Sequence, residues 1–330
     1  MTGKLNKSLS LNRFRKSSSH TRPKPAMTPF GSAQMPSVVS RERRAARLEN
    51  SIENIPSLNN ILTQILQLCN DPNTTNKDFE KCISSDQGLT VRLLKMINSS
   101  YFGLPNKINT ISHAVGMLGT GSLKSIVTAA TTNKLLYRNL KYYGYAKGGL
   151  WVHSLMCAGI ARHLGNKTFK LGRDTAEELF VAGLLHDVGK IAISPVLSDT
   201  VEEFLSHADE NRESSLCEVE KEIFGLDHAE VGEKLMKKWN LSNLLMNGVR
   251  HHHSQTESDE EATFVRVLQL AHHMTLKSNQ GLEKEYRWHH KNQPPNLFDS
   301  LGMCEDDEQS LFEELQDVFE EINALSQNIQ

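Results

Sequence analysis

From Ile52 to about residue 275, apolar residues recur at helical spacing, and this pattern constrains the fold more than any other feature. Ile55, Leu58, Ile61 and Ile65 follow one another at intervals of three or four residues, which places them on one face of a helix. The same spacing predicts helices over 76–84, 89–98, 111–118, 122–127, 150–164, 175–187, 228–239, 241–253 and 263–274. Strand-type alternation is scarce, so the sequence predicts an all-α fold of about ten to twelve helices.

Short polar residues mark where several of these helices begin and end. Asp86 precedes one predicted helix and is expected to cap it, while Asn98 and Ser99 are expected to hydrogen-bond the turn that follows. The sequence GTGS at 119–122 interrupts the apolar spacing. We therefore expect two separate helices there, with Ser122 capping the second.

Composition divides the chain into four parts. Residues 1–50 are rich in Lys, Arg, Ser and Pro and lack apolar periodicity, which predicts a disordered basic tail. Residues 51–140 and 141–280 carry the helical pattern and are predicted to form two helical lobes. Residues 281–330 are predicted to be a linker and an acidic amphipathic helix. Its apolar stripe, expected to dock on this or a sister chain, consists of Leu311, Leu315, Val318, Phe319, Ile322 and Leu325.

Several classes of protein are excluded by composition. The five cysteines are odd in number and form no CxxC pair, so neither a disulfide framework nor a cysteine zinc site is expected, as in a reducing cytosol. No apolar run reaches the roughly 18–20 residues that a membrane-spanning helix needs, and the basic N-terminus lacks the apolar region of a secretory signal. We therefore expect a cytoplasmic protein without a membrane span. The net charge of −2 indicates no particular partner.

Histidines occur on five separate helical segments of the second half. They are His153, His186 beside Asp187, His228, the run His251–His253, and the pair His272–His273. Imidazole and carboxylate groups are common ligands of zinc, iron and manganese. Adjacent helix residues lie about 100° apart, so His186 and Asp187 both face one metal only near a helix end, which Gly189 is expected to supply. The sequence therefore predicts a common pocket for these side chains.

These motifs resemble a known family. The segment GLLHDVGK at 183–190, with HAEVG at 228–232 and VRHHH at 249–253, resembles the HD superfamily of metal-dependent phosphohydrolases. The D-x-x-L-x-x-x-L-L-x-x-x-N-S segment at 86–99, with the YFG turn and the AVGMLG helix that follow, is similar to the HDOD family, a similarity that covers roughly residues 52–275. This resemblance implies an all-α bacterial signalling module, in which an N-terminal helical bundle packs on an HD-like half. Most HDOD proteins have no demonstrated hydrolase activity.

Seven positions of this chain match the metal-ligand pattern that the resemblance implies. They are His153, His186, Asp187, His228, His252, His253 and His272. The register of the middle pair is open, since a shift by one residue would give His251 and His252. The resemblance implies a divalent metal at this site, either iron, manganese or zinc. Asp187 is the candidate catalytic residue if the site hydrolyses phosphate esters.

Three departures from the family pattern argue against catalysis. His272 stands where active enzymes have an aspartate, and such catalysis needs an anionic group beside the metal-bound water. The Gly-Tyr-Pro signature of the branch that cleaves cyclic dinucleotides is absent after the histidine run. The glutamate that this branch places one turn before its first histidine would fall at Gly149. Together these changes favour a metal pocket without a complete catalytic set.

Three functions remain open at this point. The first is a non-enzymatic regulatory module that acts through a protein partner or a small ligand such as a nucleotide. The second is a metal-dependent phosphohydrolase of nucleotides or phosphodiesters. The third is nucleic-acid binding through the basic tail, which has few interleaved aromatic residues and no recognisable reading fold, so it is not expected. The sequence favours the first.

Overall fold

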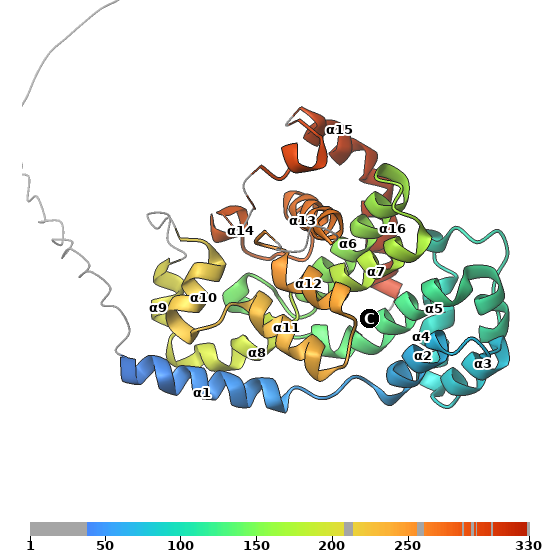
Figure 1. The fold of residues 1–330 in the computed structure, drawn as a ribbon, viewed down its shortest axis with the longest axis horizontal. Helices are drawn as coiled ribbons and strands as arrows, with labels where there is room; N and C mark the ends of the chain where they lie inside the picture. Colours follow the sequence, from blue (N-terminus) through green and yellow to red (C-terminus); the bar gives the residue numbers. More distant parts are fainter. Residues whose placement is uncertain are drawn as a thin grey trace, which may run out of the picture. The chain divides into compact units, whose positions relative to one another are not determined.

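The computed structural model describes residues 38–207, 214–255, 261–285, 287–291, 294, 296–304 and 306–328. These residues form sixteen α-helices with short 3-10 or π segments between them, and their one isolated bridge joins Leu140 to Tyr145. The predicted all-α fold is confirmed (Figure 1). The predicted number of helices was too low, because several short helices lie in segments without apolar periodicity.

The first lobe is built on one long helix, α5, against which three shorter helices pack. The elements are α2 (Asn60–Asn70), α3 (Asn76–Ser84), α4 (Gln87–Ile97), η1 (Ser100–Phe102) and α5 (Ile111–Leu136). The carboxylate of Asp86 accepts a hydrogen bond from the Leu89 amide at 2.8 Å, so the predicted cap of α4 is confirmed. Such a cap satisfies one of the amides that a helix leaves unpaired at its N-terminus.

The glycine pair in the first half divides α5 into two helical stretches, as expected, because the dihedral angles of Gly119 are not helical. Gly119 has φ of 77°, and α5 continues beyond it after a kink. Ser122 does not cap a helix, so that prediction is wrong. Its buried hydroxyl donates instead to Glu177 Oε1 at 2.6 Å. Since α5 also packs on α6 and α7, this bond helps to join the first lobe to the second.

Helices α6 and α7 form the centre of the second lobe and pack closely on each other. Gly183 permits this contact, because a Cβ there would lie 2.8 Å from the backbone of Ala158. Around them, α12 and α13 contact α7, and α11 contacts α8 and α12. The bounds are η2 (Lys141–Tyr143), α6 (Gly149–His163), η3 (Leu164–Thr168), α7 (Arg173–Leu185), α8 (Gly189–Ile193), η4 (Ser194–Asp199), α9 (Val201–His207), α10 (Leu216–Phe224), α11 (His228–Lys238), α12 (Asn243–His251) and α13 (Ala262–Lys277).

The apolar stretch Arg173–Asp199 is long and apolar enough to match a membrane span by length and composition. The expectation of no such run therefore needs correction. Within the fold, however, 89% of the apolar window is buried, as is usual for a core helix.

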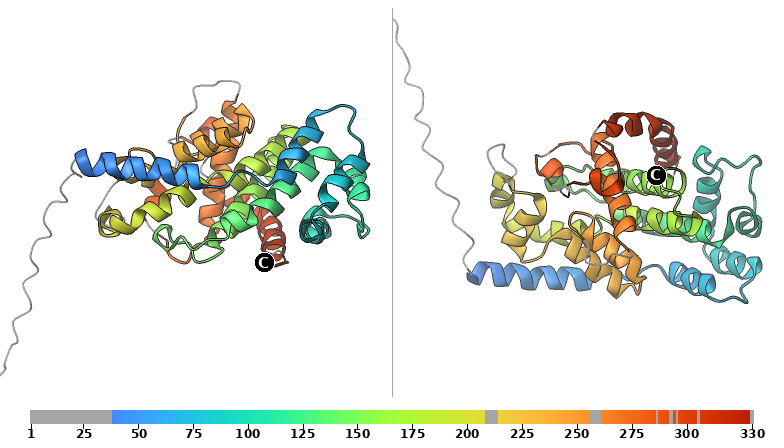
Figure 2. Two further views of the ribbon diagram at one scale, coloured as in Figure 1. Left: turned by 90° about the horizontal axis from the view of Figure 1, so that it is seen from below. Right: turned by 45° about the horizontal axis from the view of Figure 1, so that its top comes forward.

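Helix α1 (Val38–Asn54) corrects the prediction of a disordered tail through residue 50. Residues 38–50 belong to this helix, whereas residues 1–37 lie outside the described part of the chain. Leu48 is buried, and α1 contacts α8, η4, α10 and α11 of the second lobe (Figure 2). The Ser51 hydroxyl donates to the Ala192 carbonyl at 2.7 Å. The charged face of α1 concealed this packing, because only a few of its residues are apolar.

The C-terminal part of the chain folds back on its own body. It consists of α14 (Arg287–Lys291), η5 (Asp299–Leu301), α15 (Asp307–Glu314) and α16 (Gln316–Asn328). The predicted apolar stripe is buried, and α16 contacts α6, η1 and α4. Ile322 fits over Gly159, where a Cβ would lie 2.6 Å from its Cδ1. The stripe therefore docks on this chain.

Candidate metal centre

The His-Asp pair lies in the turn between α7 and α8. Helix α7 ends at Leu185, His186 is its C-cap, and α8 begins at Gly189. Gly189 is not the left-handed residue that often ends a helix, so the predicted reason for this glycine is wrong. A Cβ on Gly189 would lie 1.9 Å from the carbonyl oxygen of His228. The glycine is required because α8 passes directly against the start of α11, which brings His228 toward Asp187.

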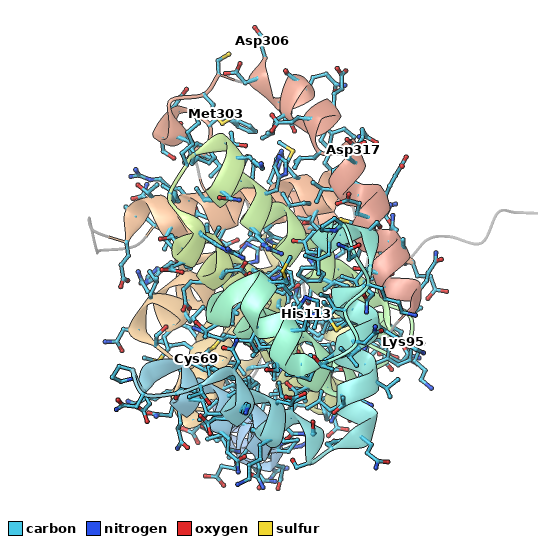
Figure 3. All side chains as sticks on the ribbon, turned by 90° about the vertical axis from the view of Figure 1, so that its right-hand side faces the viewer. Cys69, Lys95, His113, Met303, Asp306 and Asp317 are labelled. Carbon is cyan, nitrogen blue, oxygen red and sulfur yellow. The ribbon has the colours of Figure 1, made fainter. Side chains whose placement is uncertain are left out.

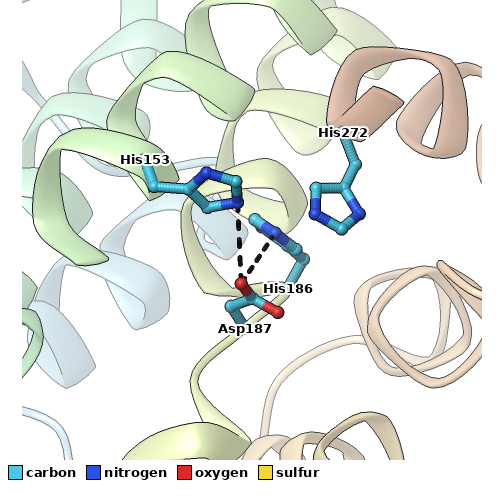
Figure 4. A group of neighbouring side chains, drawn as sticks. All are labelled: His153, His186, Asp187 and His272. Atoms are coloured by element: carbon cyan, nitrogen blue, oxygen red, sulfur yellow. Dashed lines mark ion pairs between the residues drawn. The ribbon is translucent and has the colours of Figure 1, made fainter. Parts of the chain in front are cut away.

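All seven predicted ligand residues lie together in the second lobe. Their side chains form two neighbouring groups that share Asp187, and within each group the ligand atoms lie within 4.8 Å of one another. The first group is His153, His186, Asp187 and His272 (Figure 4). The second group is Asp187, His228, His252 and His253. His251 points away and pairs with the Ser254 hydroxyl at 3.1 Å, so the structure favours the register with His252 and His253.

Apart from His253 Nε2 and His228 Nε2, which lie 3.1 Å apart at hydrogen-bond distance, the distances from Asp187 to the histidines suit ligands of one ion better than they suit hydrogen bonds. Oδ2 of Asp187 lies 3.6 Å from His153 Nε2 and 3.4 Å from His186 Nε2. Oδ1 lies 3.4 Å from His228 Nε2 and 3.7 Å from His252 Nε2. Ligands placed tetrahedrally around zinc, at its usual bond lengths, are about 3.4 Å apart. The residues therefore fit a bound metal ion.

Unpaired polar atoms support the same conclusion. Both ring nitrogens of His153, Nε2 of His186, His252 and His272, and Oδ1 of Asp187 are buried without a hydrogen-bond partner among the described residues. Leaving a buried polar atom unpaired costs about 1–3 kcal/mol. Several such atoms facing one another would be destabilising in a purely structural core. A cation in the first group would satisfy Nε2 of His153, His186 and His272, and a cation in the second group would satisfy Asp187 Oδ1 and His252 Nε2.

Lys190 and Glu220 support the cluster, and sequence reasoning missed both. The Lys190 ammonium donates to Asp187 Oδ2 at 2.6 Å. One oxygen of Glu220 accepts from the backbone amide and the Nδ1 of His228, at 2.7 and 2.6 Å. Its other oxygen accepts from the Tyr143 hydroxyl at 2.8 Å. A carboxylate that holds the far nitrogen of a histidine in this way fixes the tautomer that presents Nε2 to a metal.

The sequence contains a signal for one of these two residues. Lys190 belongs to the GLLHDVGK segment, one turn after the His-Asp pair. This spacing was sufficient to predict an ion pair with Asp187. Glu220 lies on α10, a helix for which no prediction was made, eight residues before His228. Only the packing of α10 on α11 identifies it.

Burial and charge set the protonation of the cluster. Burial lowers the pKa of His153, His253 and His272 well below the usual value, and that of His252 to about 4. These imidazoles are therefore neutral near pH 7, the form that binds metals. Burial also opposes a charge on His186, but the adjacent Asp187 carboxylate raises its pKa to about 10. Burial raises the pKa of Asp187, yet Lys190 and His186 together hold it well below its usual value.

The cluster is enclosed. His153, His186, Asp187 and His228 are fully buried. A cavity of about 10 Å³ lies beside His252, His253 and His272, and it offers roughly the space of one water molecule. Gly149, where a catalytic branch would have a glutamate, lies directly under the segment after α13, because a Cβ there would be 2.3 Å from the Gly281 carbonyl oxygen. The backbone of that segment also bonds to the turn that precedes α6, where the Glu283 amide donates to the Gly144 carbonyl at 2.8 Å.

Solved structures with this fold come from several bacteria. An HDOD domain protein of unknown function from Geobacter sulfurreducens matches with a TM-score of 0.66 and 24% identity, covering 89% of this chain and 99% of that one. A Shewanella amazonensis protein named "Putative phosphohydrolase" matches with a TM-score of 0.61 and 19% identity, covering 87% and 99%. A Marinobacter aquaeolei protein named "Putative signal transduction protein" matches with a TM-score of 0.60 and 17% identity, covering 88% and 66%. At these identities the similarity establishes the fold.

Sequence comparison identifies the family. An uncharacterised protein of Treponema pallidum is 25% identical over 223 residues, which are 66% of this chain and 41% of that protein. This chain therefore spans about two fifths of the length of that relative. The sequence profile of the HDOD domain matches residues 55–255, more than half of the chain. The two-lobed helical fold agrees with that match, and the chain belongs to the HDOD domain family.

Proposed function

We propose that this chain is a metal-binding regulatory module that does not turn over a substrate. The observation that carries the proposal is a complete set of ligand side chains enclosed by the fold, with a cavity of only about 10 Å³ beside it. A phosphodiester is many times larger than one water molecule, so it does not fit the cavity that the described residues leave beside His252, His253 and His272. An enclosed ion can still stabilise one conformation of the lobe and link that conformation to a protein partner.

The chemistry of the donor atoms supports one position for the ion and one class of metal. Asp187 Oδ2 already accepts from Lys190, whereas Oδ1 has no hydrogen-bond partner among the described residues. The group that includes Oδ1, namely Asp187, His228, His252 and His253, is therefore the better site for a first ion. Three imidazoles and one carboxylate suit zinc or iron better than manganese. When bound, such an ion supplies Lewis acidity.

The experiment is a measurement of metal content together with activity. The full chain is purified without chelator, and its zinc, iron and manganese are measured by plasma mass spectrometry beside the His228→Ala variant. We expect about one equivalent of zinc or iron, its loss in the variant, and no metal-dependent cleavage of bis(p-nitrophenyl) phosphate. A chain without bound metal would contradict the metal site, and cleavage that disappears in the variant would contradict the regulatory assignment.

A metal-dependent phosphohydrolase is the second candidate. The observation in its favour is that one carboxylate, Asp187, is shared by two adjoining ligand groups, an arrangement suited to a pair of ions that together polarise a phosphate ester. The variant His272→Asp separates the two candidates, because it adds the missing carboxylate without opening the site. We expect it to remain inactive toward the same substrate. Activity in this variant would show that the missing carboxylate, and not the enclosure of the ligand cluster, prevents hydrolysis in the unchanged chain.

A further inference from the structure

The first lobe carries a groove that the metal centre does not explain. It lies between α4 and the loop that leads to α5, measures about 440 Å³, and has a floor formed by Val91, Leu94 and Ile108. Val91 is 54% exposed, the highest value among the large apolar side chains of the described residues. Exposed apolar surface inside a concave site is typical of a binding surface.

A family motif holds the groove open. Asn98 donates from Nδ2 to the Ile108 carbonyl at 2.8 Å, and its Oδ1 accepts from the Ile108 amide at 2.7 Å. The same side chain donates to the Leu94 carbonyl at 2.7 Å. The two bonds to Ile108 hold the loop at a set distance from the end of α4, and the bond to Leu94 fixes the Asn98 side chain on that helix. The groove is therefore formed before any partner arrives, which lowers the entropy lost on binding.

The charge at the rim has one sign. Lys95 and Lys107 line the groove, and no acidic residue does. Neither lysine has an ion-pair partner within the part of the chain that the structure describes, and both are exposed (Figure 3 labels Lys95). Two lysines beside an apolar floor complement a ligand that combines carboxylates with an apolar side chain.

We propose that this groove binds a short acidic segment of a partner protein, which inserts an apolar side chain over Val91 and places its carboxylates at Lys95 and Lys107. The inference rests on the proposed regulatory function, because a module that acts through a partner needs a surface for it. A groove that combines apolar side chains with two lysines at its rim suits a peptide segment. It lies in the first lobe, away from the enclosed ligands of the second.

Peptide display tests the proposal. Random twelve-residue peptides are selected against the immobilised full chain, and the enriched peptides are labelled and measured by fluorescence anisotropy. We expect enrichment of Asp and Glu around an apolar residue. The double variant Lys95→Glu, Lys107→Glu should weaken binding at least about tenfold, because attraction becomes repulsion. The matched control is Lys77→Glu, Lys134→Glu, which makes the same change of charge at exposed lysines outside the groove and should bind normally.

Each outcome decides the question. Enriched peptides without acidic residues, or peptides whose binding the groove variant leaves unchanged, would overturn the proposal. A second variant, Val91→Ala, tests the apolar floor without a change of charge and should weaken binding severalfold. Metal content is measured on the same preparations. If a chain without metal binds acidic peptides, the groove proposal stands and the metal site is contradicted. If a chain with metal selects no acidic peptides, the metal site stands and the groove proposal is contradicted.

Discussion

Asn98 in the first lobe and the histidine cluster in the second are both polar motifs of the same family, yet their bonding is opposite. The Asn98 side chain donates to the carbonyls of Leu94 and Ile108 and accepts from the Ile108 amide. The cluster instead buries six ring or carboxylate atoms without partners among the described residues. A polar group whose hydrogen bonds are all made within the fold is accounted for by its structural role. An unsatisfied buried group requires something that completes it, so the two lobes have different roles although they form one helical body.

The largest effect that would test this contrast is expected from Asp187→Ala. The variant removes the carboxylate shared by both ligand groups and leaves the buried Lys190 ammonium without its partner. We expect complete loss of metal and a free energy of unfolding lower by about 3–5 kcal/mol. Denaturant unfolding and mass spectrometry measure the two quantities. Retention of metal would remove Asp187 from the site.

Glu220→Gln should have the next largest effect. The amide can still accept from the Tyr143 hydroxyl or the His228 ring, but it no longer holds His228 with a negative charge. We expect metal affinity to fall about 10–100-fold, measured by competition with a chromophoric chelator. Tyr143→Phe, which keeps the carboxylate, should lose less. Equal losses in both variants would mean that Glu220 acts only through packing.

In the first lobe, Asn98→Ala should reduce stability without affecting metal. It removes three bonds to backbone groups, so we expect the free energy of unfolding to fall by about 1–2 kcal/mol. Metal content should equal that of the unchanged chain. A variant that loses both stability and metal would show that the two lobes do not behave as separately as their bonding suggests.

The smallest effect is expected at the exposed ion pair of Arg47 on α1 with Asp199. Both side chains are well exposed, and such pairs contribute little because water screens them. Asp199→Ala should leave the unfolding midpoint and the metal content unchanged. A clear loss of either would show that the attachment of α1 supports the metal centre through α8.

Periodicity and motifs located most helices that expose one polar face, but the prediction that Ile55 and Leu58 share a helix with Ile61 is wrong, because both lie in the segment between α1 and α2. Helix α3 was predicted with its observed bounds, and the roles of Asp86 and Asn98 follow from their chemistry at a helix start and a turn. Helices α8, α9 and α10 were missed because they are short, and the apolar residues of α8 are buried on all sides. Helix α1 was missed for the opposite reason, since most of its residues are charged or polar and few are apolar.

The sequence by itself determined the all-α class, because helical spacing is a local property, and its motifs were sufficient to indicate the family. Through that resemblance it also predicted the residues of the cluster, with the register of the histidine run 251–253 left open. Only the tertiary structure decided that His252 and His253 join the cluster, that Glu220 orients His228, that Gly149 lies under Gly281 and that Asn98 holds a groove open. These are contacts between segments distant along the chain. They depend on how closely helices and loops pack in the folded chain, and a local sequence pattern does not determine that distance.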